Sequence, residues 1–99
     1  MDINFEYHEV NPSEALETFV TEKLNKLFNK YEFIVRADVF FKIQNSSDNT
    51  GKISSIRLSA PGPRLFAEDN SDSYHKSVTE AINQLDRQLE KRKGKMKTH

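Results

Sequence analysis

The chain has 99 residues, with 15 basic side chains, 15 acidic side chains and no cysteine. This length supports one hydrophobic core, and the lack of cysteine excludes a disulfide framework, a cysteine-ligated zinc site and a thiol nucleophile. Residues 1–6 lack the basic and apolar segments of a secretory signal, and no apolar stretch approaches the roughly 20 residues that span a bilayer. We therefore expect a single cytoplasmic domain over residues 1–99, with no membrane contact and a flexible basic tail from about residue 94.

The first two elements are a strand and a helix. Residues 3–8 alternate between apolar and polar side chains, which predicts a half-buried strand. Asn11 can then cap a helix, with Pro12 at the first helical position and Glu14 reaching back as in a capping box. Apolar residues at spacings of three and four follow, so an amphipathic helix ending near Lys30 is expected.

Three further strands are predicted. Residues 34–43 alternate, and one face of that strand would carry Val35, Ala37, Val39, Phe41 and Ile43. Residues 45–51 consist of turn-forming types and predict a hairpin loop. A third strand is expected at about residues 52–60. A Pro-Gly-Pro turn then leads into a short fourth strand over residues 64–68.

The last element is a long amphipathic helix from Tyr74 to at least Lys93, with several possible caps between Asp69 and Asp72. The order is therefore β-α-β-β-β-α. An α+β fold follows, in which a four-stranded sheet carries both helices on one face. If the first crossover is right-handed, the two helices run parallel and their C-terminal ends meet at one end of the molecule.

Basic residues concentrate at the end of the chain. Residues 87–99 contain six basic residues and one acid, a net charge of +5, so the first 86 residues carry −5. A local basic patch on an acidic body is typical of a protein that meets a polyanion. The alternative is a solvated helix end whose cations only complement the helix dipole.

Two sets of cations occupy the C-terminal halves of the two helices. Lys23, Lys26 and Lys30 lie on one flank of the first helix. Arg87, Lys91 and Lys95 form a ridge on the second helix with about 6 Å of rise per step, similar to the spacing of phosphates along a nucleic-acid strand. Parallel helices would bring both sets to the same end, which favours RNA binding over dipole complementarity alone. Arg92 falls in the apolar row and is expected to pack its stem against the sheet.

The last helix resembles that of a known family. The match rests on Ala81-Ile82, Leu85, Arg87-Gln88-Leu89, Lys91 and Lys93, and the first helix, from Glu14 to Leu27, is also similar. The chain resembles the short form of the ribosome hibernation-promoting factors, also called ribosome-associated inhibitor or sigma-54 modulation proteins. Thr79 and Asn83 depart from the pattern, because acids are common at those positions.

The resemblance implies a stationary-phase stress factor that binds the small ribosomal subunit and its ribosomal RNA in the channel of messenger and transfer RNA, and so inhibits translation. Whether ribosomes would also dimerise stays open. The implied phosphate contacts are Lys23, Lys26, Arg87, Lys91, Lys93 and Lys95, and the helix geometry adds Lys30. We expect the free protein to be a monomer.

Other functions find less support in the sequence. The three histidines show no ligand spacing, and no nucleophile motif or glycine-rich phosphate loop is present, so we expect no metal, cofactor, small-molecule substrate or enzymatic activity. Phe40 and Tyr74 can stack on bases, but packing within the protein is the simpler expectation. Two alternatives remain open: a general double-stranded-RNA-binding domain, and a protein-interaction module that regulates a transcription factor.

Overall fold

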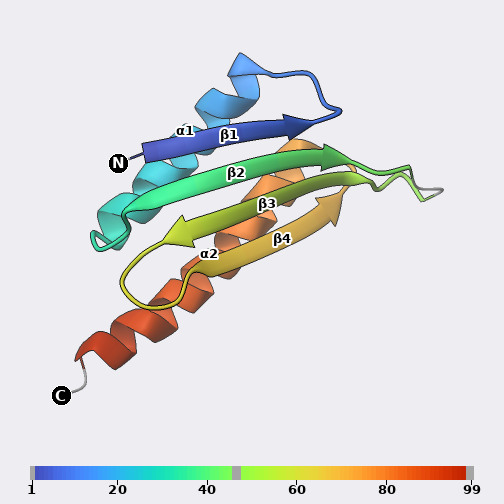
Figure 1. Cartoon of the computed structure of the whole chain (residues 1–99). Helices are drawn as coiled ribbons and strands as arrows, with labels where there is room; N and C mark the ends of the chain where they lie inside the picture. The colour runs from blue at the N-terminus through green and yellow to red at the C-terminus, as the bar shows by residue number, and fades with distance from the viewer. Residues whose placement is uncertain (1, 46–47, 98–99) are drawn as a thin grey trace.

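The computed structural model describes residues 2–45 and 48–97 and contains the six expected elements in the expected order (Figure 1). They are β1 (Asp2–His8), α1 (Glu14–Lys30), β2 (Arg36–Ile43), β3 (Lys52–Ser59), β4 (Leu65–Ser71) and α2 (Tyr74–Lys97). This confirms the predicted α+β fold with its β-α-β-β-β-α order.

The four strands form one mixed sheet in the order β1-β2-β3-β4. β1 pairs with β2 in parallel, and the remaining neighbours are antiparallel. Parallel neighbours need a crossover connection, and α1 supplies it between β1 and β2. Both helices cover the same face of the sheet and run in the same direction, so their C-terminal ends point to the same end of the molecule, as predicted (Figure 1).

The core lies between the helices and this face of the sheet. Each element contributes side chains at its own period, every second residue on a strand and every third or fourth on a helix. The buried apolar residues of the helices are Leu16, Val20, Leu24, Leu27, Phe28, Val78, Ala81, Ile82, Leu85 and Leu89, and those of the strands are Ala37, Val39, Phe41, Ile56, Leu58, Leu65 and Ala67. A buried hydrogen bond of 2.7 Å joins the hydroxyls of Ser54 and Ser77, which satisfies both polar groups inside the core.

The start of α1 differs from the prediction. The helix is capped by Ser13, not Asn11, and the Ser13 hydroxyl accepts a hydrogen bond of 3.2 Å from the backbone N–H of Leu16. The extended backbone of Ser13, at φ −137° and ψ 113°, is the conformation that a capping residue needs.

The remaining boundaries also shift. β2 begins at Arg36, so Val35 lies outside it and is 64% exposed, while Ile43 at its far end is 49% exposed. The two residues are exposed and are not part of the core. β4 continues to Ser71 because its last residues pair with the start of β3. The cap of α2 is therefore Ser73, whose hydroxyl accepts a hydrogen bond of 3.2 Å from the N–H of Lys76.

The end of α2 is the largest difference from the sequence prediction. The sequence predicts a basic tail from about residue 94, but α2 continues through Gly94 to Lys97. Lys30, the last residue of α1, lies beside Asp86, so α2 extends eleven residues beyond that contact. At 1.5 Å per residue this part of the helix is about 16 Å long. Figure 1 shows it projecting past the edge of the sheet.

Candidate nucleic-acid interface

A shallow groove runs between α1 and α2 on the surface of the helical layer. Its volume is about 170 Å³, and it is lined by Lys23, Lys26, Leu27 and Lys30 from α1 and by Thr79, Ile82, Asn83 and Asp86 from α2. The three lysines are three and four positions apart, so they share one flank of α1. The structure therefore brings together all three cations that the sequence predicts on the first helix.

Lys30 is held at one end of this groove by an acidic residue of α2. Its Nζ lies 3.1 Å from one carboxylate oxygen of Asp86 and 3.3 Å from the other. The lysine side chain is 52% exposed and the aspartate 38% exposed, so water screens this pair and its contribution to stability is small. Part of the positive charge in the groove is neutralised by this contact.

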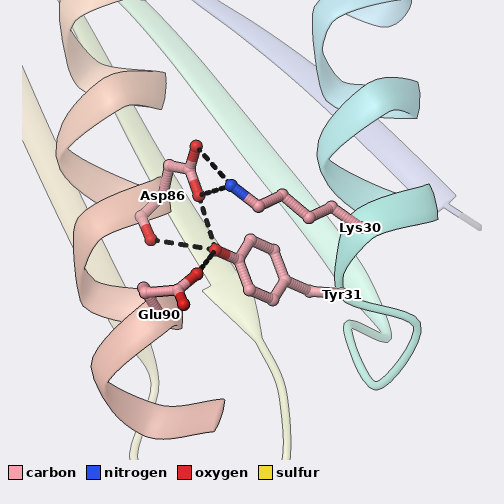
Figure 2. A network of polar contacts seen from close by, with 4 residues as sticks. All are labelled: Lys30, Tyr31, Asp86 and Glu90. Atoms are coloured by element: carbon pink, nitrogen blue, oxygen red, sulfur yellow. Dashed lines mark hydrogen bonds and ion pairs between the residues drawn. The ribbon is translucent and has the colours of Figure 1, made fainter. Parts of the chain in front are cut away.

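A buried tyrosine completes the contact between the helices (Figure 2). The Tyr31 hydroxyl lies 2.6 Å from Asp86 Oδ1, 2.7 Å from Glu90 Oε2 and 3.4 Å from the backbone oxygen of Asp86. A phenol has a single proton to donate, so the two carboxylates share it. The hydroxyl thus bridges two acids that lie four residues apart on α2 and would otherwise repel each other.

These contacts shift two ionisation equilibria. Burial, followed by the hydrogen bonds to Asp86 and Glu90, raises the pKa of the Tyr31 phenol well above its ordinary value. The hydrogen bond from Tyr31 lowers the pKa of the Asp86 carboxyl against the opposing effect of burial, and Lys30 lowers it further. The junction is therefore arranged for a neutral phenol and a charged aspartate.

Lys93 of α2 also reaches this junction. Its Nζ lies 5.8 Å from the centroid of the Tyr31 ring, and the Nζ of Lys30 lies 5.3 Å from the same centroid. Both distances are within the range of cation–π attraction. Cations from the C-terminal halves of both helices thus meet at one aromatic ring, although the residue of α2 that takes part is Lys93 and not one of the ridge formed by Arg87, Lys91 and Lys95.

Arg87 and Lys91 lie on a different part of α2. Each is two positions after a fully buried leucine, Leu85 or Leu89, and so points away from the sheet. Both are exposed, and Arg87 lies 3.9 Å from Glu80 on the same helix. They form an outward ridge and do not line the groove. The predicted third member, Lys95, belongs to α2, but its side chain lies outside the residues whose side chains are described.

Two other predicted side chains, those of Arg92 and Tyr74, are accounted for by packing. Arg92 is half-buried and donates a hydrogen bond of 3.2 Å to the backbone oxygen of Pro61, so it holds the β3–β4 turn. Tyr74 packs edge-on against Phe41 and donates a hydrogen bond of 2.8 Å to the backbone oxygen of Lys42. Phe40 is half-buried on the opposite face of the sheet, below the guanidinium of Arg57.

The sequence did not predict the cluster of Tyr31, Asp86 and Glu90. Tyr31 fits the apolar stripe of the first helix, and nothing local indicates that its hydroxyl meets acids 55 and 59 residues later. The available sign was the pair Asp86 and Glu90, two acids four positions apart in an otherwise basic stretch. Among residues 2–45 and 48–97, neither helix has both the length and the apolar character required to cross a membrane.

Comparison with known proteins identifies the family. The family model described as "Sigma 54 modulation protein / S30EA ribosomal protein" matches residues 3–97. A ribosome hibernation promoting factor from Salmonella typhimurium is 31% identical over 99 residues, which cover 100% of both chains.

Solved structures agree with this match. A ribosomal subunit interface protein from Coxiella burnetii superposes with a TM-score of 0.84 at 26% identity, over 95% of this chain and 99% of that one. The N-terminal domain of Protein Y from Thermus thermophilus gives a TM-score of 0.78 at 18% identity, over 92% and 98%, and this likeness concerns the fold alone. With a family match that spans residues 3–97, the chain belongs to the sigma-54 modulation protein / S30EA ribosomal protein family.

Proposed function

We propose that this protein is a cytoplasmic, non-catalytic ribosome hibernation factor that binds the small ribosomal subunit and inhibits translation. In this proposal it occupies the channel of messenger and transfer RNA and touches ribosomal RNA through its two helices. The names of its relatives, a ribosome hibernation promoting factor and a ribosomal subunit interface protein, support a ribosomal partner.

The observation that carries the proposal is the meeting of Lys30 and Lys93 at the ring of Tyr31. It supports a single cationic region built from two helices that are distant in sequence. Lys23 and Lys26 extend that region along the groove, and the exposed Arg87 and Lys91 extend it over the outer side of α2. Phosphate groups bind such a region by replacing its counterions, and the bases need not be read.

The number of cations sets the expected salt dependence. Five or six phosphate contacts predict a log–log slope of the association constant against salt on the order of −4 to −5. Lys30 adds to this slope only if RNA displaces Asp86 from its ammonium group. A slope near zero would contradict electrostatic docking.

Co-sedimentation with purified small subunits tests the proposal. The double variant Arg87→Glu, Lys91→Glu should lose co-sedimentation, because it turns the outer ridge of α2 from positive to negative. Its thermal midpoint should stay close to that of the parent protein, since both side chains are exposed and the contact of Arg87 with Glu80 is 3.9 Å long. Retained co-sedimentation would refute the role of these residues.

A matched control separates local from total charge. The double variant Lys52→Glu, Lys76→Glu makes the same change in net charge at exposed positions outside the groove and the ridge, and it should still co-sediment. Excess duplex RNA should not displace the parent protein from small subunits, whereas a general duplex-RNA binder would be displaced. Gradient sedimentation of whole ribosomes then distinguishes blocked monomeric ribosomes from paired ones.

A further inference from the structure

The sheet face opposite the helices is open to solvent. Both helices cover one face (Figure 1), so every second residue of each strand points to the other side. On this open face the side chains of Asp38 and Arg57 are register partners on β2 and β3, and those of Arg57 and Phe66 are register partners on β3 and β4. None of these side chains contributes to the basic groove.

Four flat side chains cross this face in a diagonal row, one from each strand. The row consists of His8 on β1, Phe40 on β2, Arg57 on β3 and Phe66 on β4. The ring centroids of His8 and Phe40 are 6.5 Å apart, and the Arg57 guanidinium carbon lies 5.5 Å from the centroid of Phe40. Phe66 is 52% exposed, although it belongs to the aromatic residues that usually pack inside.

The backbone of Phe66 is fixed in place. Its carbonyl oxygen accepts a hydrogen bond of 3.0 Å from the side-chain amide of Gln88 on α2, and its register partner is Arg57. The exposed ring is therefore carried by a strand whose backbone is fixed by hydrogen bonds, and not by a loop. A rigidly mounted aromatic ring loses little conformational freedom when a planar ligand stacks on it.

The cations beside the row that could contact a phosphate are arginines. Arg36 and Arg57 both pair with the single carboxylate of Asp38, at 2.9 Å and 3.3 Å, and that carboxylate is 5% exposed. Two acids also lie on this face: Glu6, the register partner of Phe40, and Glu68, which pairs with Lys42. The face as a whole therefore carries no surplus positive charge, and a phosphate would have to bind at the arginines. The Nε of Arg57 is buried and has no hydrogen-bond partner within the described part of the chain. The exposed Arg64 adds a further cation two residues before Phe66.

We propose that this row is a platform on which the bases of single-stranded RNA stack, separate from the groove between the helices. Aromatic rings and guanidinium planes on an open four-stranded sheet are a known means of holding unpaired bases, and nearby cations hold the phosphates. An apolar protein partner fits less well, because Arg57 separates the two phenylalanine rings and the imidazole of His8 ends the row. Val35 and Ile43, the other large exposed apolar residues in the described ranges, do not belong to it.

The chain contains no tryptophan, which allows a direct test. In a Phe66→Trp variant the new indole should be quenched saturably at low salt by an eight-residue oligoadenylate RNA, because a stacked base quenches indole emission. Ile43→Trp is the matched control: Ile43 is 49% exposed but follows the buried Phe41 on the helix-facing side of β2. Emission of the control should not change.

Binding measured by anisotropy of the labelled oligonucleotide gives a second readout. Phe66→Leu keeps an apolar side chain without a ring and should weaken binding at least about fivefold, whereas Phe66→Tyr should bind as the parent does. Absence of quenching in Phe66→Trp, equal quenching in Ile43→Trp, or equal binding by Phe66→Leu would overturn the proposal. Emission that depends on protein concentration without RNA would identify a second copy of the chain as the occupant, and would also overturn it.

The test is independent of the proposed ribosome contact. When Arg87→Glu and Lys91→Glu are added to the Phe66→Trp variant, quenching by the oligonucleotide should persist, because these residues project from the helical layer. Loss of ribosome binding together with retained quenching would leave the platform in place. The opposite result, with ribosome binding retained and quenching absent in Phe66→Trp, would remove the platform alone.

Discussion

Lys30 and Asp86 are 56 positions apart in the chain, yet the lysine Nζ lies 3.1 Å from the aspartate carboxylate. The pair joins the last residue of α1 to the middle of α2 and places an acid in a groove whose other charged residues are all lysines. Asp86 is thus an internal competitor for any phosphate that approaches Lys30. The same aspartate therefore holds the two helices together and competes with an incoming anion for Lys30.

Removal of this competitor should strengthen binding to ribosomal RNA. In Asp86→Asn the amide oxygen can still accept the hydrogen bond from Tyr31, but Lys30 loses its ionic partner. We expect tighter binding to small subunits and a salt slope that is steeper by up to about 0.9, the contribution of one more phosphate contact. Binding titrations between about 50 and 200 mM salt measure this change in slope.

Asp72→Asn is the control for that substitution. Asp72 pairs with Lys76 at 3.0 Å, so its removal also frees a lysine and deletes one negative charge, but at the opposite end of α2. Binding and slope should remain those of the parent protein. An equal gain in both variants would show that only the total charge matters.

The Tyr31 hydroxyl should contribute measurably to stability. Tyr31→Phe keeps the buried ring but removes the proton shared by Asp86 and Glu90, which then face each other without a bridge. Hydrogen bonds to charged groups are worth about 1.5–3 kcal/mol, and partial exposure of both acids reduces this to about 1–2 kcal/mol. Urea unfolding at neutral pH measures the loss as a lower midpoint at constant slope.

Tyr74→Phe provides the comparison for this effect. The Tyr74 hydroxyl donates to a neutral carbonyl oxygen, that of Lys42, so its removal should cost less than the removal of the Tyr31 hydroxyl. If Tyr31→Phe were as stable as the parent protein, the bridge between the two acids would have no energetic role.

The three tyrosines should titrate late. Burial raises the pKa of all three phenols: that of Tyr7 reaches about 12 with further help from its hydrogen bond to Glu17, and Tyr31 is raised further. Absorbance at the phenolate band should therefore stay low at pH 10, where free tyrosine is half ionised. Because the pKa values of the phenols are higher in the folded state than in the unfolded state, the neutral phenols contribute to the free energy of unfolding. This contribution is complete below about pH 10 and is lost as pH rises through the folded-state pKa values. Half-ionisation at pH 10 in the folded protein would contradict the buried hydroxyls.

The ion cluster of Arg36, Asp38 and Arg57 on the open sheet face should make the free energy of unfolding fall in acid. Burial alone would raise the pKa of the Asp38 carboxyl, but the hydrogen bonds and charges of Arg36 and Arg57 outweigh it and lower the pKa. The resulting stabilisation is present above the ordinary aspartate value of about 3.9 and is lost as pH falls through the folded-state value. Asp38→Asn should therefore lower the free energy of unfolding at pH 7 by about 1–3 kcal/mol, and by much less at pH 2.

Urea titrations of both proteins at the two pH values measure this difference. Glu68→Gln serves as the comparison, since Glu68 is more exposed and is held by Ser55 and Lys42. Its loss at pH 7 should be smaller. A penalty for Asp38→Asn that is independent of pH would exclude the ion cluster as its cause.

The order of elements and the faces that pack could be predicted because each follows a local period. Val39 and Phe41 on β2, and Leu85 and Leu89 on α2, are buried where alternation and helical spacing place them. Boundaries were less predictable because neighbouring residues compete for the same role. Asn11 and Ser13 are both good caps, and the local pattern does not choose between them; in the structure the Ser13 hydroxyl accepts the N–H of Leu16. Gly94 does not end α2 although it weakens a helix, since the residues on both sides favour helix.

The lysines of the groove were predictable from a helical wheel, but the pairing of Lys30 with Asp86 was not. The contact of Tyr31 with Asp86 depends on the distance and rotation between two helices, which no local pattern determines. The same holds for the open face, where the neighbours of Arg57 depend on strand register. Charge pattern thus predicted which residues are cationic, and tertiary packing determined which of them are already paired.

The projecting end of α2 makes this chain a strong electric dipole despite its zero net charge. Residues 87–99 carry +5 and the preceding 86 residues carry −5, while the molecule extends 49 Å along its longest axis. In the field of a polyanion such a body experiences a torque, so it rotates with the tip of α2 leading before any contact forms. The length of α2 therefore helps to orient the protein as it approaches a polyanion.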